Sequence, residues 1–254
     1  MRIDLNADVG ESFGAFTIGD DAGLMKVVTS ANVAAGFHAG DPSVLRRTIR
    51  MAKTHGVAVG AHPGFPDLAG FGRREMHVTT REAEDLVLYQ IAAVAGVAAA
   101  EGARLQHVKA HGALFNMAAV DRDLAEALAR AVASFDRTLI LFASPGSEMA
   151  SAARRLGLRV AHEVFADRAY DPSGLLAPRK QAGAVVHDVD AVVARAVRLA
   201  TDGTVVALDG SVLKLDADTM CVHGDTPGAA RLAAAVRQGL EAAGVVVASI
   251  GDSR

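Results

Sequence analysis

The chain has 254 residues, and its 26 Lys and Arg against 29 Asp and Glu give a net charge of −3. A hydrophobic fraction of 51% with so small a net charge excludes a disordered protein, and the lack of a basic excess argues against a dedicated nucleic-acid binder. The single cysteine excludes an intramolecular disulfide bond and a cysteine-based zinc cluster, and it is typical of a reducing compartment.

Short apolar runs alternate with helical patterns along the whole chain. Strands are expected at residues 2–8, 28–34, 57–62, 105–111, 138–143, 158–165, 219–223 and 245–250. Helices are expected between them, at residues 43–55, 80–101, 120–134, 146–156, 187–201 and 226–243. This alternation predicts parallel βαβ units. We therefore predict one α/β domain over residues 1–254, a (β/α) barrel of seven or eight strands, with an open doubly wound sheet as the alternative.

The expected helices have recognisable ends. Three of them begin with a capping side chain before a proline, at Asp41-Pro42, Ser144-Pro145 and Thr226-Pro227. Thr79 and Glu82 have the spacing of a capping box. A glycine follows four of the helices, at Gly56, Gly102, Gly157 and Gly244. Between two apolar runs, Asp209-Gly210 predicts a hairpin turn.

The sequence shows neither an export signal nor a membrane span. The N-terminal segment MRIDLNADVGES has no apolar region behind a basic start. The longest apolar run, residues 91–100, is about half of the ~20 residues needed to cross a bilayer. These features predict a cytoplasmic protein with no membrane partner, and the Ala-rich helices would suit a homo-oligomer interface.

In a (β/α) barrel, functional side chains gather at the carboxyl ends of the strands, and polar residues occur at several such ends here. Asn6 and Asp8 are two positions apart, so they share one face of the first strand with Asp4. Polar side chains inside a barrel are costly unless they are hydrogen-bonded or used. We therefore favour a functional Asp8, with a turn-capping role at Gly10 as the alternative.

The next two strands end in histidines. His38 lies between Gly36 and Gly40 after the second strand, a pattern that also fits an ordinary turn histidine. His62 ends the third strand after small residues. The loop that follows, residues 63–78, is long and rich in Gly and Pro, which is typical of a functional lid, and a surface excursion is an equal alternative.

The fourth strand carries the most informative pattern. His107, Lys109 and His111 alternate with Val108 and Ala110, so three cationic or titratable side chains share one face. A lysine in an enclosed site is suited to anion binding or to acid–base chemistry. A solvated edge strand is the alternative, and it fits poorly with a parallel sheet that is covered by helices.

The sixth and seventh strands carry further candidates. Glu163 lies on the sixth strand and joins the polar groups of the expected barrel mouth. In the long loop that follows, Arg168 and Lys180 would suit a carboxylate clamp, with a charged surface loop as the alternative. His223 and Asp225 precede a helix N-terminus, whose free N–H groups favour an anion.

Several motifs that identify enzyme classes are missing. The chain has no phosphate-binding loop of the type G-x-x-x-x-G-K-[ST] and no strand-linked G-x-G-x-x-G. It also has no H-E-x-x-H zinc motif and no G-x-S-x-G nucleophile elbow. If the protein uses ATP, no standard motif in the sequence locates the site.

Six segments of the chain follow the motifs of one known family in the same order. They are DLNADVGESFG, SANVAAGFHAGDP, GAHPGFPDLAGFGRR, VKAHGALFN, EVFADRAYDPSGLLAPR and CVHGDTPGA. With these segments the chain closely resembles the LamB/YcsF family. The resemblance implies a barrel related to the glycoside hydrolase/deacetylase group. It also implies 5-oxoprolinase activity, the ATP-dependent cleavage of 5-oxo-L-proline (pyroglutamate) to L-glutamate, ADP and phosphate, together with partner subunits B and C.

The residues that match this family's motifs form the candidate site. We assign catalytic roles to Asp8, His62, His111 and Asp225. We assign substrate binding to Asn6, His38, Lys109, Arg168, Tyr170 and His223. In this hypothesis Lys109 and Arg168 bind a carboxylate or phosphate of the substrate. Asp8 and one histidine, either His62 or His111, activate the attacking water.

Two other functions remain open at this point. Asp8, His38 and His62 match in type the Asp/His/His metal set that related deacetylases use, so a metal-dependent amidohydrolase with a divalent metal is one alternative. A non-catalytic subunit that only binds the substrate is the other, because the missing nucleotide motif leaves the ATP site to a partner. ATP is expected as a co-substrate, at a site that the sequence does not identify.

Overall fold

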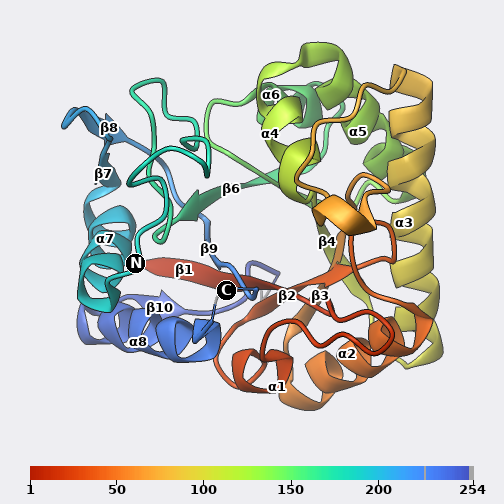
Figure 1. The fold of residues 1–254 in the computed structure, drawn as a ribbon, viewed down its shortest axis with the longest axis horizontal. Coiled ribbons are helices and arrows are strands. Elements are labelled where there is room, and N and C mark those ends of the chain that lie inside the picture. Colours follow the sequence, from red (N-terminus) through yellow and green to blue (C-terminus); the bar gives the residue numbers. More distant parts are fainter. Residues whose placement is uncertain (226, 252–254) are drawn as a thin grey trace.

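The computed structural model describes residues 1–225 and 227–251 (Figure 1). In this part of the chain, seven parallel strands form a closed barrel: β1 (Arg2–Val9), β2 (Ser30–Ala34), β3 (Ala58–His62), β4 (Leu105–Lys109), β5 (Ile140–Ala143), β6 (Arg159–Phe165) and β9 (Thr219–Val222). The ring closes at β1, because Asn6 pairs with Ser30 of β2 on one side and with Cys221 of β9 on the other. The predicted (β/α) barrel is therefore confirmed, and the open doubly wound sheet is wrong.

An eighth parallel strand pairs with β1 without entering the ring. β10 (Val246–Val247) pairs with Arg2 and Ile3 of β1, whereas β9 pairs with β1 from Asp4 onward. The strand expected at residues 245–250 is thus only two residues long. β7 (Thr204–Val206) and β8 (Val212–Lys214) form an antiparallel hairpin, which confirms the turn predicted at Asp209-Gly210.

Helices surround the barrel on its outside (Figure 1). Their bounds are α1 (Asp21–Leu24), α2 (Pro42–His55), α3 (Thr80–Ala100), α4 (Gly112–Val120), α5 (Arg122–Phe135), α6 (Glu148–Arg155), α7 (Val189–Asp202) and α8 (Ala229–Ala242), with a short 3-10 helix at Leu68–Gly70. Two of these helices were not predicted from the sequence: α1, which is only one turn long, and α4. The α4 segment GALFNMAAV is apolar almost all round, so it lacks the periodicity that marks an amphipathic helix.

Most of the predicted helix ends are confirmed. Asp41 accepts hydrogen bonds from the backbone N–H groups of Ser43 and Val44 at the start of α2. Thr79 and Glu82 form the predicted capping box of α3. The glycines that follow four helices all have a positive φ, between 66° and 77°, and they are Gly56, Gly102, Gly157 and Gly244.

Two predicted helix starts have a different outcome. The predicted cap at Ser144 is wrong, because Gly146 is left-handed with a φ of 74° and turns the chain before α6 begins. Ser147 is the N-cap of α6 instead. The predicted cap of α8, Thr226, lies outside the described residues, and the helix begins at Ala229.

Among the described helices, α3 is the one that is long and apolar enough to cross a membrane by length and composition. About a third of this stretch, 33%, is buried inside the molecule. On its inward face Gln90 is fully buried, and its amide donates to the carbonyl of Gly64 and accepts from the N–H of Gly64, both at 2.9 Å. These contacts are those of a helix that packs against the outside of the barrel.

The interior of the barrel is polar and forms three hydrogen-bonded layers. The lowest layer joins Asp4, Ser30 and Thr219; the middle layer joins Asn6, Asn32, His107 and Glu163; the uppermost layer joins Asp8, His62, Lys109 and Cys221. A glycine makes room for the middle layer. A Cβ added to Gly60 would lie 2.0 Å from Nε2 of His107, so no side chain fits there. The uppermost layer lies at the carboxyl ends of the strands.

Candidate active site

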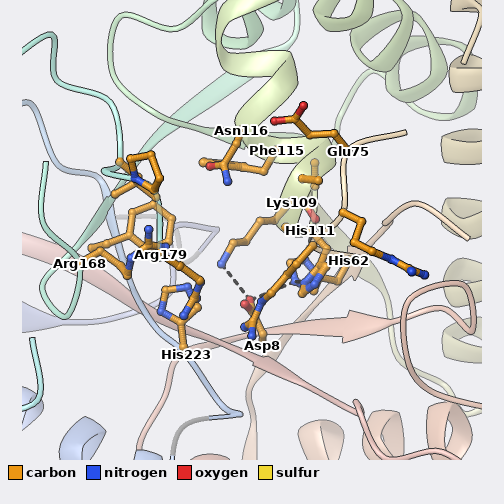
Figure 2. A pocket seen from close by; sticks show the side chains of 18 of the residues that line it. Asp8, His62, Glu75, Lys109, His111, Phe115, Asn116, Arg168, Arg179 and His223 are labelled. Atoms are coloured by element: carbon orange, nitrogen blue, oxygen red, sulfur yellow. Dashed lines mark hydrogen bonds and ion pairs between the residues drawn. The ribbon is translucent and has the colours of Figure 1, made fainter. Parts of the chain in front are cut away.

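The carboxyl ends of the barrel strands surround a cavity of about 710 Å³. The floor of this cavity is made by Asp8, His62, Lys109 and His111 (Figure 2). Its walls come from the loop after β3, the start of α4, the end of β6 and the loop that follows it, and the residue after β9. They include Arg73, Arg74, Glu75, Phe115, Asn116, Phe165, Arg168, Leu176, Pro178, Arg179, Lys180 and His223. Both long loops that the sequence singled out therefore contribute to one cavity.

Lys109 lies in the floor with its side chain only 3% exposed. Its Nζ donates to Asp8 Oδ1 at 2.8 Å and to Cys221 Sγ at 2.9 Å, and it lies 3.0 Å from Glu163 Oε1. Burial alone would lower the pKa of Lys109, but these three neighbours outweigh burial and raise the pKa well above its usual value. Each ammonium proton thus has an acceptor. Lys109 holds Asp8 in place and has no free donor for an anion in the cavity.

Asp8 is the negative charge at the centre of the floor. Its Oδ1 accepts hydrogen bonds from Lys109 at 2.8 Å and Asn32 at 2.9 Å, and it lies 3.3 Å from Nε2 of His62. Burial would raise the pKa of Asp8, but His62 and Lys109 hold that pKa well below its usual value. A carboxyl group this acidic is a weak proton acceptor. Asp8 is therefore suited to orient and stabilise positive charge beside it.

Three imidazoles meet at one side of the floor. His62, at the end of β3, donates from Nδ1 to the carbonyl of Lys109 at 2.8 Å, and its Nε2 lies 2.9 Å from Nδ1 of His111. His111, just after β4, donates from Nε2 to the carbonyl of Phe71 at 2.8 Å. His38, after β2, stacks on His111 with ring centres 3.8 Å apart. Three neighbouring strands thus contribute one histidine each to a single cluster.

Glu11, which was not predicted from the sequence, completes this cluster. Its Oε1 lies 3.5 Å from Nε2 of His38 and 3.7 Å from Nδ1 of His111. Burial and the charge of Asp8 raise the pKa of Glu11 well above its usual value. Burial, together with neighbouring histidines, lowers the pKa values of His38 and His111 well below theirs. The opening motif contains Glu11, but this residue follows the end of β1, where strand periodicity no longer predicts its direction.

The wall of the cavity carries an excess of positive charge. Arg73 pairs with Asp225 at 2.7 Å, so the predicted catalytic Asp225 is held in an ion pair. Burial and the charge of Arg179 lower the pKa of Arg168 to about 10. Arg179 itself is half-buried and forms no hydrogen bond or ion pair with the residues that the structure describes. The wall therefore favours an anionic ligand, and Arg179, which was not predicted from the sequence, is free to bind it.

Two of the predicted substrate-binding residues hold the loop after β6 together. Arg168 donates to the carbonyls of Ala184 at 3.2 Å and Ala177 at 2.7 Å. Tyr170 is 1% exposed, and its hydroxyl accepts a hydrogen bond from the N–H of Phe165 at 2.8 Å. Arg168 still lines the cavity, whereas Tyr170 is behind the wall. Both residues therefore shape the loop that covers one side of the cavity.

Two further predicted residues lie at different depths. Asn6 is in the middle layer, where it donates to Glu163 at 3.1 Å and to Thr219 at 2.7 Å. His223 lines the cavity, and its Nδ1 lies 2.7 Å from Oδ2 of Asp167. Burial would raise the pKa of Asp167, but His223 outweighs burial and keeps the pKa below its usual value. Asn6 therefore supports the floor from below, and His223 belongs to the wall.

The structure thus brings together most of the residues predicted from the sequence. Asp8, His38, His62, Lys109 and His111 meet in and beside the floor. Arg168 and His223 belong to the wall, on the opposite side of Asp8 from His62 and His111 (Figure 2). Asp225 forms an ion pair with Arg73 of the wall. Asn6 and Tyr170 do not reach the cavity. A position at the carboxyl end of a strand therefore predicted where these residues lie better than it predicted what each residue does.

His107 in the middle layer leads to a prediction about stability and pH. Burial, with the charges of Lys109 and His62, lowers the pKa of His107 from its usual 6.5 to about 3. Between these values the unfolded chain binds a proton at this position and the folded chain does not. The free energy of unfolding should therefore fall through this range as the pH falls, by up to about 1.4 kcal/mol per pH unit.

Urea unfolding of the wild type and of His107→Gln, at about pH 7 and about pH 5, checks this expectation. Gln keeps a donor for Oδ1 of Asn32, which His107 Nε2 contacts at 2.8 Å, but it cannot titrate. The variant should lose less of its free energy of unfolding on acidification than the wild type. Equal losses in the two proteins would show that the fold does not hold His107 neutral.

Comparison with known proteins identifies close relatives along nearly the whole chain. The family model described as LamB/YcsF family matches residues 3–254. The A subunit of 5-oxoprolinase from Bordetella pertussis is 53% identical over 245 residues, which are 96% of this chain and 97% of the relative. The protein of the same name from Bacillus subtilis (strain 168) is 51% identical over 254 residues, which are 100% of this chain and 99% of the relative.

Solved structures agree with this comparison. The crystal structure of a lactam utilization protein from Thermus thermophilus superimposes with a TM-score of 0.94 at 50% identity, covering 98% of this chain and 100% of that chain. A T48 deacetylase shares the fold alone, with a TM-score of 0.50 and 13% identity over 98% of this chain and 88% of its own. The barrel is therefore common to proteins whose sequences differ widely from this one.

Proposed function

The chain belongs to the LamB/YcsF family, and from this membership we propose that it is the A subunit of a 5-oxoprolinase. In this role it opens the ring of 5-oxo-L-proline to give L-glutamate, which is the hydrolysis of a cyclic amide. The observation that carries the proposal is the identity of 51% and 53%, over nearly the full length, to relatives that carry the name of this A subunit. The TM-score of 0.94 to a lactam utilization protein supports it.

The charge of the cavity suits this substrate. 5-Oxo-L-proline is a small ring with one carboxylate, and the wall carries more cations than anions. We place the carboxylate against Arg179, because a free guanidinium binds a carboxylate through two parallel hydrogen bonds. Arg179 thereby takes the role that the sequence hypothesis gave to Lys109 and Arg168, whose donors contact other groups of the protein.

The amide of the ring then lies over the floor, where water attacks its carbonyl carbon. His62 and His111 line the cavity there, and the cluster to which they belong activates the water. Asp8, with its Oδ1 at 3.3 Å from His62, stabilises the positive charge of this cluster, as a buried carboxylate does for a catalytic histidine. The C–N bond of the ring breaks, and the ring nitrogen takes up a proton to become the amino group of glutamate.

We place the coupling to ATP with partner subunits B and C. Water attacks an unactivated amide slowly, and phosphorylation of the amide oxygen makes the ring carbon more electrophilic. The positive wall suits a phosphorylated ring as well as a carboxylate. Two waters are consumed, one that opens the ring and one that balances the conversion of ATP to ADP and phosphate. The lack of a standard nucleotide motif in this chain supports an ATP site on the partners.

An assay of glutamate and phosphate release from 5-oxo-L-proline and ATP tests the proposal. Three samples are compared: the chain alone, the chain with subunits B and C, and subunits B and C alone. We expect glutamate only from the complete mixture. No glutamate from the complete mixture would overturn the proposed function. Glutamate from the chain alone would overturn the assignment to a multi-subunit enzyme, and glutamate from B and C alone would make the chain dispensable for catalysis.

A further inference from the structure

We propose that Glu11, His38, His62 and His111 bind one divalent transition-metal ion. One ligand atom from each of the four residues lies within 4.8 Å of all the others, and all four residues are buried. The loops and ends of four neighbouring strands bring these atoms together, from β1 to β4 along the barrel. The proposal rests on the positions of protons and lone pairs in this cluster.

The hydrogen bonds of His62 and His111 determine where their protons lie. Nδ1 of His62 faces the carbonyl of Lys109, and Nε2 of His111 faces the carbonyl of Phe71, each at 2.8 Å. A carbonyl oxygen only accepts, so each of these nitrogens carries the proton of its ring. In neutral rings the two remaining nitrogens, Nε2 of His62 and Nδ1 of His111, each carry a lone pair, and these two atoms lie 2.9 Å apart. Such an arrangement is repulsive unless a cation is shared between them.

An extra proton on one ring would lie between these two nitrogens and would leave His38 without a partner. Neither ring nitrogen of His38 has a hydrogen-bond partner among the described residues, and Oε1 of Glu11 has none either. Both side chains are almost fully buried, at 0% and 3% exposure. Buried polar atoms are nearly always paired in native proteins. A metal ion is the one cation that accepts lone pairs from all four ligand atoms at once.

The surroundings of the cluster hold the ligands in place. Carbonyl acceptors such as those of Lys109 and Phe71 orient the rings of metal-binding histidines through the second nitrogen. Two glycines bring the backbone against the third ring. A Cβ at Gly64 would lie 2.6 Å from Nδ1 of His38, and one at Gly72 would lie 2.7 Å from Cβ of His38. His38 is therefore confined beside His111.

The donor types indicate the class of metal. Three imidazoles and one carboxylate suit Zn²⁺, Co²⁺ or Ni²⁺, whereas Mg²⁺ and Ca²⁺ prefer oxygen ligands. Asp8 is not part of the set, although the sequence grouped it with His38 and His62, because Lys109 already occupies its Oδ1.

An ion in this cluster would lie at the floor of the cavity, which His62 and His111 line. Water bound to such an ion has a pKa near 7 in known zinc enzymes, so it would supply hydroxide for ring opening. This catalytic consequence rests on the proposed function. The metal site itself rests on the geometry of the cluster alone.

Metal titration of the full chain tests the proposal. Purified protein is stripped with a chelator, dialysed and titrated separately with Zn²⁺, Co²⁺, Ni²⁺ and Mg²⁺, while bound metal is measured by mass spectrometry. We expect one transition-metal ion per chain, no binding of Mg²⁺, and a higher melting temperature in the bound form. Binding well below one ion per chain for all three transition metals would overturn the proposal.

Variants connect the binding to the four residues. Glu11→Gln and His38→Gln should each weaken metal binding by at least about 10-fold. His77→Gln is the matched control, because His77 is exposed and away from the cluster, and it should bind metal like the wild type. Circular dichroism verifies that each variant folds. If His38→Gln does not fold, the test rests on Glu11→Gln, which keeps the shape of the side chain. Unchanged affinity in Glu11→Gln would overturn the site. Stoichiometric metal in a chain without 5-oxoprolinase activity would overturn only the proposed function.

Discussion

Replacing Asp8 by Asn is expected to lower the turnover of 5-oxo-L-proline by the complete enzyme at least about 100-fold. The substitution keeps the shape of the side chain and removes the negative charge that faces the histidine cluster. The new amide would also direct an N–H₂ group at either Lys109 or His62, where Oδ1 of Asp8 now lies at 2.8 Å and 3.3 Å. The fold should persist, because Glu163 still pairs with Lys109 at 3.0 Å.

Steady-state assays of the variant with subunits B and C measure this effect. Asp188→Asn is a matched control, because Asp188 is exposed and caps α7, and Asn caps a helix as well as Asp. The control should keep the turnover of the wild type. If Asp8→Asn were folded and as active as the control, Asp8 would have no part in the reaction.

Replacing Lys109 by Met is expected to have the largest effect on stability. Lys109 neutralises two buried carboxylates, those of Asp8 and Glu163, and its removal leaves Glu163 without the one cation that contacts it among the described residues and leaves Asp8 with His62 alone, at 3.3 Å. Breaking a buried charge pair in this way costs about 3–5 kcal/mol of the free energy of unfolding. For a chain of this size the melting temperature should fall by roughly 6–20 °C. Turnover should fall as well, because Asp8 is no longer held in place.

Thermal unfolding and activity are measured together for this variant. Lys26→Met is the control, since Lys26 is exposed and outside the barrel interior, and its melting temperature should match the wild type. Adding Glu163→Gln to Lys109→Met removes one of the two unpaired charges, so it should restore part of the stability and none of the activity. A melting temperature for Lys109→Met equal to that of the control would show that the interior does not depend on this cation.

Strand periodicity predicted the floor of the cavity correctly. Alternation along the first and fourth strands put Asp8 and Lys109 on the inward face, and these two side chains meet at 2.8 Å. The carboxyl ends of parallel strands meet at the same end of a barrel, which is why side chains from distant parts of the sequence became neighbours. The same reasoning placed His62 and His111 together.

Side chains beyond the strand ends were not predictable in the same way. Glu11 and Arg179 both belong to motifs that were recognised, but neither was assigned a role, because no local period says where a loop residue points. Arg168 and Tyr170 were assigned to the substrate, and the structure shows that they form hydrogen bonds within and beside their own loop. The direction of a loop side chain depends on what packs against it, and that is a property of the whole fold.

The sequence by itself determined the alternation of strands and helices and the inward face of the first and fourth strands, whereas closure into a barrel was seen only in the structure. Both follow from local patterns, namely the two-residue period of strands, the longer period of helices and the glycines that end them. Only the tertiary structure decided which groups are charged and which lone pairs are left without partners. Lys109 and Asp8 are 101 positions apart in the chain, and His62 and His111 are 49 apart. The pKa of a buried group depends on such distances and on burial, which exist only once the barrel has closed.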